Sequence, residues 1–409
     1  MRIAIVNANG RQVGGIETYL DRLIPALVAE GHAVGLFCER AGSARNAELA
    51  PAAEVARWCV ETTSPETALG SLRAWGPDVI YAHALVDVRL EESLLALAPA
   101  VAFAHGYVGT CISGAKSFKF PAAEPCARRF GAACLLQYYP RRCGGWAPLT
   151  MWRLYRDQSR RLALLASYRK LLVASPHMVE EYRRHGLDEK AQAVRLPIPP
   201  PPDPAPVAPE WRRSGWRLLF LGRFDPLKGI HLFIECLPEV RRALDCELSA
   251  TFAGDGPARA ECEELARRIS RLEPRVRVEF PGWLTAVERD ALFRQTDLLV
   301  VPSVWPEPFG QVGLEAGWYG IPSVAFQVGG IGSWLVDGVN GRLATARPPT
   351  AAALARAIVA ALTDAGGYRR LSEGALAAAK AHSMETHLAE LIRVFESAKG
   401  QQADLMDAD

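Results

Sequence analysis

The stretch LPIPPPPDPAPVAPE at residues 196–210 divides the chain into two parts. Proline at this density cannot continue a helix or a central strand, because each ring fixes φ and removes a backbone donor. The stretch therefore predicts a semi-rigid, extended connector. Short apolar runs alternate with helix-like segments on both sides of it, so it indicates a boundary between two domains.

The N-terminal part begins with the apolar run RIAIVN at 2–7 and a glycine turn. IETYLDRLIPALVAEG at 16–31 follows, has helical periodicity and ends at a glycine. Further apolar runs with turn residues at their ends are AVGLFC, DVIYAH and AVAFAH. This alternation predicts βα units and a mainly parallel sheet covered by helices on both faces.

The alternation starts again after residue 210. Strands are predicted for WRLLFLG, LSATFAG, RVRVEF, DLLVVPS and IPSVAF, with helical segments between the first four. From about Ala351 to Lys399 the chain is expected to be helical, and the polar tail 400–409 to be frayed. We therefore predict an α/β protein of two doubly wound domains, with the ligand in the cleft between them.

Composition limits the function classes. The 409 residues suffice for two ordinary domains, and 49% hydrophobic with 22% charged residues is typical of a globular protein. A formal charge of +2 does not favour nucleic acid as a partner, and no apolar run reaches the roughly 18 residues that span a bilayer. We expect a cytoplasmic location, where the cysteines are mostly reduced.

Two strand-end segments of the C-terminal part carry residues suited to an anionic, hydroxyl-rich ligand. GRFDPLKG at 222–229 places Arg223 and Lys228 before a helix, where side-chain cations and the helix dipole favour a diphosphate. EPFGQVGLE at 307–315 places Glu307 in a strand-to-helix loop, with Glu315 expected about two turns into the helix. Carboxylates accept paired hydrogen bonds from vicinal hydroxyls. Taken singly, a solvated loop or helix face explains either segment.

Two weaker signals lie in the N-terminal part. Gly14 and Gly15 stand directly before the helix at 16–31, an arrangement that lets an anion approach the backbone. His105 ends the apolar run AVAFA and is expected to face the cleft, although a lone histidine is more often an ordinary hydrogen-bonded residue.

Several motifs occur in one order along most of the chain: GGIETYL, AHG, GRFDPLKG, AGDGP, EPFGQVGLEAGWYGIPSVAF, GGI and DGVNG. In this the sequence resembles the retaining glycosyltransferase family 4, the glycogen-synthase-like transferases of group 1. The resemblance implies the GT-B fold of two facing Rossmann-like domains with a cleft between them. It implies domains at 1–195 and 211–383, a linker at 196–210, and a C-terminal helix at 384–409 that crosses back to the first domain.

The resemblance also implies roles for single residues. Arg223 and Lys228 would neutralise the diphosphate of a nucleoside-diphosphate sugar. Glu307 would hold the hydroxyls of the donor sugar, and Glu315 the ribose diol. Backbone N–H groups of Phe309, Gly310 and Gln311 would contact sugar and phosphate, Gly15 the phosphates, and His105 the donor sugar. No metal or other cofactor is expected to be needed for catalysis. Trp318 and Tyr319 depart from the family pattern, which has small residues there.

Residues 106–150 interrupt the alternation as a cysteine-rich, basic insert. Its four cysteines, Cys111, Cys126, Cys134 and Cys143, lack the C-x2-C spacing of a typical zinc site. Reduced structural thiols, a structural zinc site and disulfides therefore all stay open. From 128 to 170 the chain has ten basic residues, among tyrosines and tryptophans, and only Asp157 is acidic. This composition indicates an anionic partner, such as an acceptor diphosphate or the inner face of a membrane, with a solvated helix face as the alternative.

The sequence thus predicts a retaining glycosyltransferase, peripheral to the inner membrane face, that acts in surface polysaccharide or lipid-linked glycan synthesis. Its acceptor is a glycan, a lipid-linked sugar or a small molecule. A nucleotide-sugar epimerase on the same architecture and a non-catalytic nucleotide-sugar-binding scaffold are the alternatives.

Overall fold

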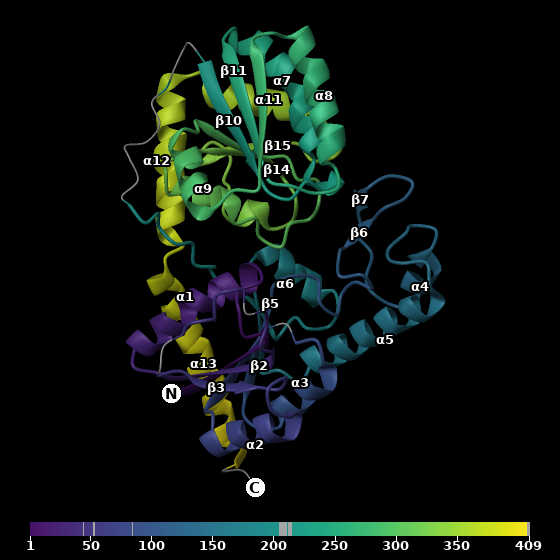
Figure 1. The fold of residues 1–409 in the computed structure, drawn as a ribbon, viewed down its shortest axis with the longest axis vertical. Coiled ribbons are helices and arrows are strands. Elements are labelled where there is room, and N and C mark those ends of the chain that lie inside the picture. Colours follow the sequence, from purple (N-terminus) through teal and green to yellow (C-terminus); the bar gives the residue numbers. More distant parts are fainter. Residues whose placement is uncertain (44, 52–53, 84, 204–210, 212–214, 407–409) are drawn as a thin grey trace. The chain divides into compact units, whose positions relative to one another are not determined.

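A computed structural model describes the whole chain except residues 44, 52–53, 84, 204–210, 212–214 and 407–409. The chain forms two compact units (Figure 1). The first contains Met1–Lys116, Ala127–Pro197 and the stretch from Met384, and the second contains Ile198–Ser383 together with the short segment Ser117–Cys126. Residues 204–210 of the predicted linker lie outside the described residues.

The first unit is built on a seven-stranded parallel sheet. Its strands, in spatial order, are β3 (Ala56–Cys59), β2 (Ala33–Arg40), β1 (Arg2–Asn9), β4 (Val79–Ala82), β5 (Ala100–Ala104), β8 (Lys170–Val173) and β9 (Ala191–Ala193). The helices are α1 (Gly15–Ala29), α2 (Pro65–Trp75), α3 (Val88–Leu95), α6 (Pro176–Arg183) and α13 (Met384–Met406). The central strands β4 and β5 are apolar throughout, and β1 is apolar from Ile3 to Val6, as expected for strands that helices cover on both faces.

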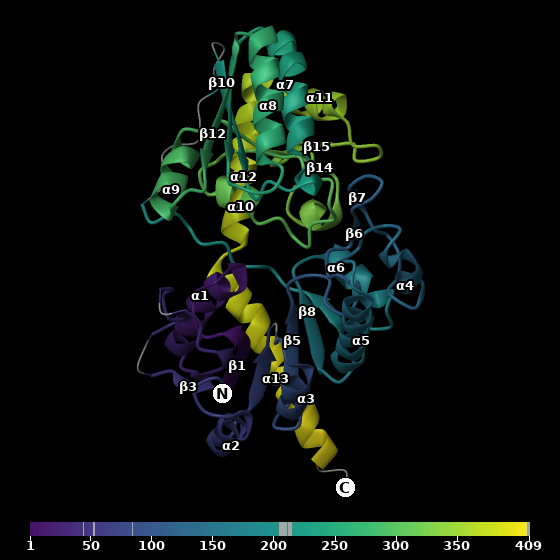
Figure 2. The same ribbon diagram turned by 45° about the vertical axis from the view of Figure 1, so that its right-hand side comes forward.

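The second unit has a six-stranded parallel sheet. Its strands, in spatial order, are β12 (Val276–Gly282), β11 (Glu247–Ala253), β10 (Gly215–Leu221), β13 (Leu298–Val301), β14 (Ser323–Phe326) and β15 (Gly341–Ala344). The helices are α7 (Ile230–Leu244), α8 (Arg259–Leu272), α9 (Ala286–Arg294), α10 (Val312–Gly317), α11 (Ala351–Leu362) and α12 (Ala365–Ala381). In Figures 1 and 2, α7 and α8 lie side by side and cover a core that contains Phe220, Phe233 and Phe252.

Each sheet has a point where the strand order reverses. In the first unit β1 pairs with β2 on one side and β4 on the other, and in the second unit β10 pairs with β11 and β13. Loops that leave the carboxyl ends of such a strand pair diverge to opposite faces of the sheet, and ligands bind in the space between them. The fold therefore indicates two places where a ligand could bind. One is at the carboxyl ends of β1 and β4, and the other is at those of β10 and β13.

The predicted fold class is confirmed, with some differences in detail. The short edge strands β3, β9 and β15 were not predicted, because runs of three or four residues carry too little periodicity. The prediction of a frayed tail after Lys399 was wrong for residues 400–406, since α13 continues to Met406.

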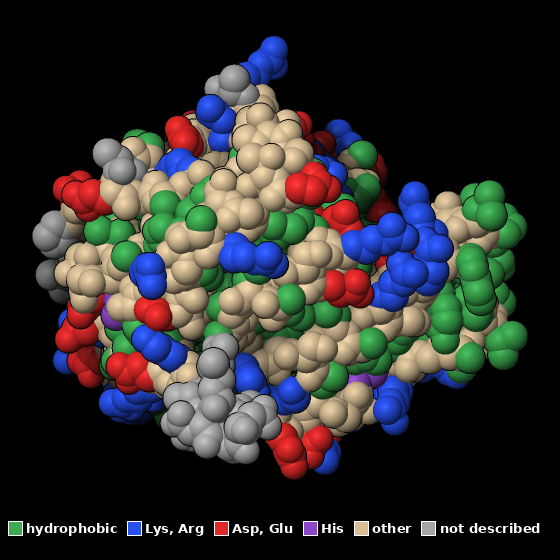
Figure 3. Space-filling view, turned by 90° about the horizontal axis from the view of Figure 1, so that it is seen from below, with side chains coloured by type: hydrophobic (Ala, Val, Ile, Leu, Met, Phe, Trp, Pro, Cys, Tyr) green, Lys and Arg blue, Asp and Glu red, His purple; other side chains and the backbone are tan. Residues whose placement is uncertain are grey.

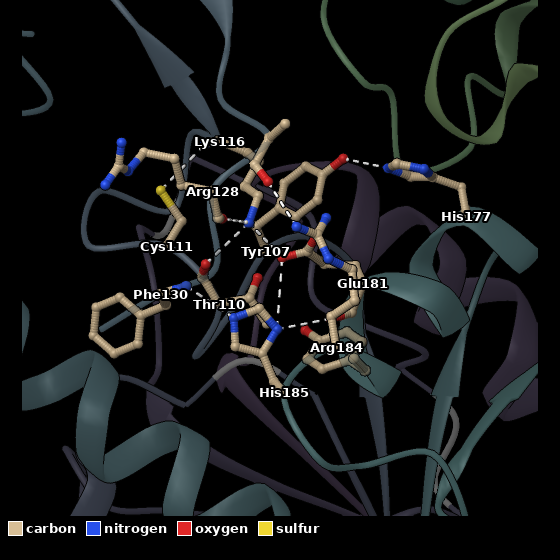
Figure 4. A network of polar contacts seen from close by, with 12 residues as sticks. Tyr107, Thr110, Cys111, Lys116, Arg128, Phe130, His177, Glu181, Arg184 and His185 are labelled. Atoms are coloured by element: carbon tan, nitrogen blue, oxygen red, sulfur yellow. Dashed lines mark hydrogen bonds and ion pairs between the residues drawn. The ribbon is translucent and has the colours of Figure 1, made fainter. Parts of the chain in front are cut away.

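The insert has its own elements and a buried polar anchor. It contains the hairpin β6 (Ser117–Phe118) and β7 (Glu124–Pro125), then α4 (Ala133–Tyr138) and α5 (Pro148–Leu165). Lys116 and Glu181 form an ion pair in which both side chains are less than 5% exposed (Figure 4). The Lys116 ammonium also donates to the carbonyl oxygens of Thr110 (3.3 Å) and Arg128 (2.8 Å). The Lys116–Glu181 pair thus holds the segment from Thr110 to Arg128 against α6 at both of its ends.

His185 completes this anchor. Its Nδ1 lies 2.7 Å from the Glu181 carbonyl oxygen, and its Nε2 accepts a 3.0 Å hydrogen bond from the backbone N–H of Phe130. The neutral ring with its proton on Nδ1 satisfies both contacts, because Nδ1 then donates. Burial lowers the pKa of His185 and favours this neutral form.

Candidate functional site

The loop after β10 lies directly against the end of β13. Gly229 ends the short 3-10 turn Pro226–Lys228 with a left-handed φ of 66°, and a Cβ atom at Gly229 would lie 2.0 Å from the carbonyl oxygen of Pro302. Asp225 caps the turn by accepting a 3.0 Å hydrogen bond from the N–H of Leu227. The glycine therefore permits the close contact that brings Lys228 to the neighbouring strand end.

Lys228 and Glu307 form an ion pair across this strand pair. The Lys228 Nζ atom lies 2.5 Å from Glu307 Oε1 and 5.5 Å from the ring centroid of Trp305. Glu307 is only 6% exposed and is therefore buried. The alternative of a glutamate in a solvated loop does not apply to it. The carboxylate of such a pair can accept hydrogen bonds from hydroxyl groups, and its cation can neutralise a phosphate.

The loop that carries Glu307 is held by backbone contacts to the 3-10 turn Gly329–Ser333. The N–H of Gly330 donates a 2.6 Å hydrogen bond to the carbonyl oxygen of Glu307. Gly329 has φ 53°, and a Cβ atom there would lie 2.4 Å from the Glu307 backbone. The buried Trp334 donates from Nε1 to the carbonyl oxygen of Phe309 at 2.8 Å. These contacts fix the loop before any ligand binds.

The segment from Phe309 to Glu315 differs from its prediction in one respect. Gly310 has φ 86° and α10 begins only at Val312, so Glu315 lies one turn into the helix and not two. In the described part of the chain, the N–H groups of Phe309, Gly310 and Gln311 donate no hydrogen bond to protein atoms. They can serve an anionic or hydroxyl ligand instead.

Glu315 has a partner that the sequence did not indicate. Arg289 on α9 places Nη1 3.6 Å from Glu315 Oε2, with the two side chains 43% and 27% exposed. Arg223, by contrast, is exposed, and among the described residues its side chain forms no ion pair. Both Glu315 and Arg223 therefore stay accessible to a ligand, while Glu307 is the buried member of the set.

The predicted residues of the first unit form a second polar cluster, at the ends of β1, β4 and β5. Gly14 is the N-cap of α1, but its N–H donates to Glu17 Oε2 at 2.9 Å and is not available to an anion. The buried Glu17 also accepts hydrogen bonds from the side chains of Asn7 and Asn9, each at 3.1 Å. A Cβ atom at Gly15 would meet no atom within 4 Å, so the space beside Gly15 is open.

His105 follows β5 and is paired with a second histidine. Its Nε2 lies 2.9 Å from Nδ1 of His83, which follows β4. Burial lowers the pKa of His105 to about 3 and that of His83 well below its ordinary value, so both rings are neutral at pH 7. One ring therefore donates to the other, and the bond fixes how His105 is turned. The run DVIYAH contains His83, but it was interpreted only as a strand.

The bulky residues at 318 and 319 have structural partners. Trp318 donates from Nε1 to the carbonyl oxygen of Ile198 at 3.0 Å. The Tyr319 hydroxyl donates to Asp290 at 2.5 Å, and its ring stacks on Phe293. These side chains pack α10 against the linker start and α9, so the departure from the family pattern reflects helix packing.

The four cysteines of the insert were left open between reduced thiols, a structural zinc site and disulfides. In the described residues, no group of three or more His, Cys, Asp or Glu side chains is arranged to hold a metal ion. Cys111 is buried, and its Sγ lies 3.5 Å from Ser113 Oγ and 3.3 Å from the backbone nitrogen of Lys116. The structure also has no disulfide between the described cysteines. This arrangement is compatible with reduced thiols, and the structural zinc site stays a prediction.

Buried neutral histidines predict a loss of stability in weak acid. Burial lowers the pKa of His105 to about 3 and of His387 to about 4, and that of His83 also falls. Below pH 6.5 the unfolded chain binds protons that the folded chain does not, so stability is complete above that pH and falls as the pH decreases. Each histidine contributes up to about 1.4 kcal/mol per pH unit.

We therefore expect the unfolding midpoint in urea to fall markedly between pH 7 and pH 5. His387→Gln removes one of these groups and should make the pH dependence shallower. A midpoint that is constant over this range would contradict the neutral, buried state of the three rings.

Of the predicted residues, the structure brings Lys228, Glu307, Phe309, Gly310 and Gln311 together at the strand ends of the second unit. Gly14, Gly15 and His105 lie at the corresponding edge of the first unit.

In the described part of the chain, no helix has the length and apolar character needed to cross a bilayer.

Sequence comparisons identify the two halves separately. Residues 13–201 match the family described as Glycosyltransferase Family 4, and residues 215–364 match Glycosyl transferases group 1. The glycogen synthase of Mycobacterium tuberculosis is 29% identical over 319 residues, which are 75% of this chain and 65% of that protein. The phosphatidyl-myo-inositol mannosyltransferase of the same species is 30% identical over 200 residues, 48% of this chain and 51% of that protein. The chain thus spans less than two-thirds of these relatives.

Solved structures share the fold over nearly the whole chain. A glycosyltransferase from Rickettsia africae has a TM-score of 0.67 at 14% identity and covers 97% of this chain and 98% of its own. Anabaena HepE, in complex with UDP and glucose, has a TM-score of 0.60 at 18% identity and covers 97% and 99%. At such identities the likeness concerns the fold alone.

Proposed function

Since the chain belongs to the glycosyltransferases of family 4 and group 1, we propose that it moves a sugar from a nucleoside-diphosphate sugar to an acceptor with retention of anomeric configuration. The observation that carries the proposal is the Lys228–Glu307 pair at the point where the strand order of the second unit reverses. A cation and a buried carboxylate at this place match the two chemically different parts of such a donor, its diphosphate and its sugar.

The reaction needs stabilisation of negative charge on the departing diphosphate. As the bond from the anomeric carbon to the phosphate oxygen breaks, the sugar acquires oxocarbenium character and the diphosphate gains charge. Lys228 and Arg223 are the cations in this loop that would bind its oxygens, which is the main way to lower the barrier. Glu307, freed from part of its contact with Lys228, would accept hydrogen bonds from sugar hydroxyls and hold the anomeric carbon in place.

The nucleoside would lie toward α10. Glu315 is suited to the ribose diol because its carboxylate is accessible, and Arg289 lies 3.6 Å from it. The N–H groups of Phe309, Gly310 and Gln311 would bind phosphate or sugar oxygens without any change of loop conformation. His105, neutral and held by His83, would offer a hydrogen bond to a sugar hydroxyl.

The relatives suggest where to begin with substrates. HepE was crystallised with UDP and with UDP-glucose, so uridine nucleotides are the first donors to test. Similar proteins are named for glycogen synthesis and for phosphatidyl-myo-inositol mannosylation, which makes glycans and lipid-linked sugars the first acceptors.

The test is an incubation of the purified protein with each nucleotide sugar, with and without a membrane extract or glycan acceptors, followed by NMR of the products. A transferase releases nucleoside diphosphate and forms a new glycosidic bond whose anomeric configuration equals that of the donor. Conversion of the donor to its epimer without acceptor would establish the epimerase instead. Donor binding with neither transfer nor hydrolysis would establish a binding scaffold.

A further inference from the structure

The exposed face of α5 combines large apolar side chains with cations, and nothing in the proposed donor chemistry uses it. Leu149 and Trp152, three residues apart in the first two turns of α5, are 84% and 57% exposed. Trp146, just before the helix, is 69% exposed, and Leu136 on α4 is 76% exposed. We call these four residues the α4–α5 apolar tip. Large side chains gathered in this way on a surface mark an interaction site.

Cations continue from this tip along the same face of the helix. Arg153, Arg156 and Arg160 follow at the spacing i, i+3, i+7, which places them on one stripe, and all three are exposed. Arg142 lies at the tip itself, with its guanidinium carbon 5.4 Å from the ring centroid of Trp146. Figure 3 shows hydrophobic side chains gathered at the right-hand edge of the view, beside a group of Lys and Arg side chains.

The three arginines of the stripe are scarcely neutralised by the protein. Among the described residues, Arg153 and Arg160 form no ion pair, and Arg156 has only the neighbouring, exposed Asp157 at 3.7 Å. A neighbouring face of α5 behaves differently: Arg161 pairs with the buried Glu91 at 3.5 Å and donates to the carbonyl oxygen of Val86 at 2.8 Å. One face of α5 is thus fixed to the unit, and the arginine stripe presents charge of which, among the described residues, only that of Arg156 has an ionic partner.

We propose that the α4–α5 apolar tip and the stripe Arg153–Arg156–Arg160 dock the protein on an anionic lipid bilayer. Tryptophan and leucine side chains insert at the boundary between headgroups and acyl chains, and neighbouring arginines bind lipid phosphates. The helix rises by roughly 1.5 Å per residue, so the three arginines lie at increasing distances from the tip. They meet the headgroup layer when the tip is inserted. A protein partner would not require that cations follow the apolar side chains along one face of the helix. The inference is independent of the donor chemistry.

The experiment is flotation of the full-length protein with vesicles of phosphatidylcholine alone or with about 30 mol% phosphatidylglycerol added. We expect at least roughly tenfold stronger binding to the anionic vesicles, decreasing with salt because charge contributes to it. The double variant L149E/W152E should lose binding, and so should R153E/R160E. All four side chains are exposed, so unfolding midpoints should match the wild type.

Matched controls lie on the second unit. Leu272 and Trp283 are 78% and 77% exposed, and L272E/W283E should bind like the wild type. Arg268 and Arg271 on α8 are exposed, and R268E/R271E controls for net charge. No binding at low salt, equal binding to uncharged vesicles, or loss of binding in the controls as well would overturn the proposal. So would a dimer of the wild type in sedimentation that L149E/W152E dissociates, since the face would then be a contact between two copies.

Discussion

Replacing Lys228 by alanine is expected to lower kcat for sugar transfer by roughly 10²–10³, because one preorganised charge on the leaving group is lost. The same change removes the partner that lies 2.5 Å from the buried Glu307. Glu307→Gln should also lower kcat by at least roughly the same factor, since the amide cannot accept paired hydrogen bonds from two hydroxyls. The measurement is steady-state transfer or donor hydrolysis with the nucleotide sugar that the protein uses.

The two residues act as a pair, so their effects should not add. The double variant K228A/E307Q is expected to lose less than the product of the two single losses, which a double-mutant cycle measures directly. The control is Arg268→Ala, an exposed cation of the same unit. Wild-type kcat in K228A would contradict the role of Lys228. Additive losses would mean that Lys228 and Glu307 do not work together.

The second large effect is on stability. Lys116→Met leaves the buried Glu181 carboxylate with only Arg184, whose side chain is 40% exposed and 3.8 Å away, and losing the buried partner of such a pair costs up to about 3–5 kcal/mol. We expect the midpoint of urea unfolding to fall accordingly, and backbone amides between Thr110 and Phe130 to exchange faster, because Lys116 holds both ends of that segment. The double variant K116M/E181M should be less destabilised than K116M, since no charge is left buried.

The same helix provides the control. Glu180 pairs with Arg183 at 2.6 Å, but both side chains are more than half exposed. Glu180→Gln should therefore leave the midpoint of urea unfolding close to that of the wild type. If K116M were as mild as E180Q, the buried pair would not be what anchors the insert.

Much of the fold could be predicted because short stretches of the sequence determine the individual strands and helices. Apolar runs such as RIAIVN and WRLLFLG stop at glycines, and helices follow with their own periodicity. The end of each strand then locates the loops that carry Arg223, Lys228 and Glu307. The short edge strands escaped prediction, because their residues form strands only through pairing with a neighbour.

The pairs within the site could not be predicted, because each joins residues from different strand ends. Lys228 and Glu307 are 79 positions apart and meet only because β10 and β13 are neighbours, which periodicity does not reveal. The contact of His83 with His105 depends likewise on the pairing of β4 with β5. Lys116 reads as one more basic residue of a basic insert, and only its burial against Glu181 distinguishes it.

The most direct test of the account is a thermal-shift screen of the purified protein against UDP, GDP, ADP, TDP and their sugars. We expect one nucleotide to raise the unfolding temperature by several degrees, and we expect Arg223→Ala and Lys228→Ala to abolish this rise while Arg268→Ala does not. No response to any nucleotide, or a response that both loop variants retain in full, would contradict a diphosphate site at the ends of β10 and β13.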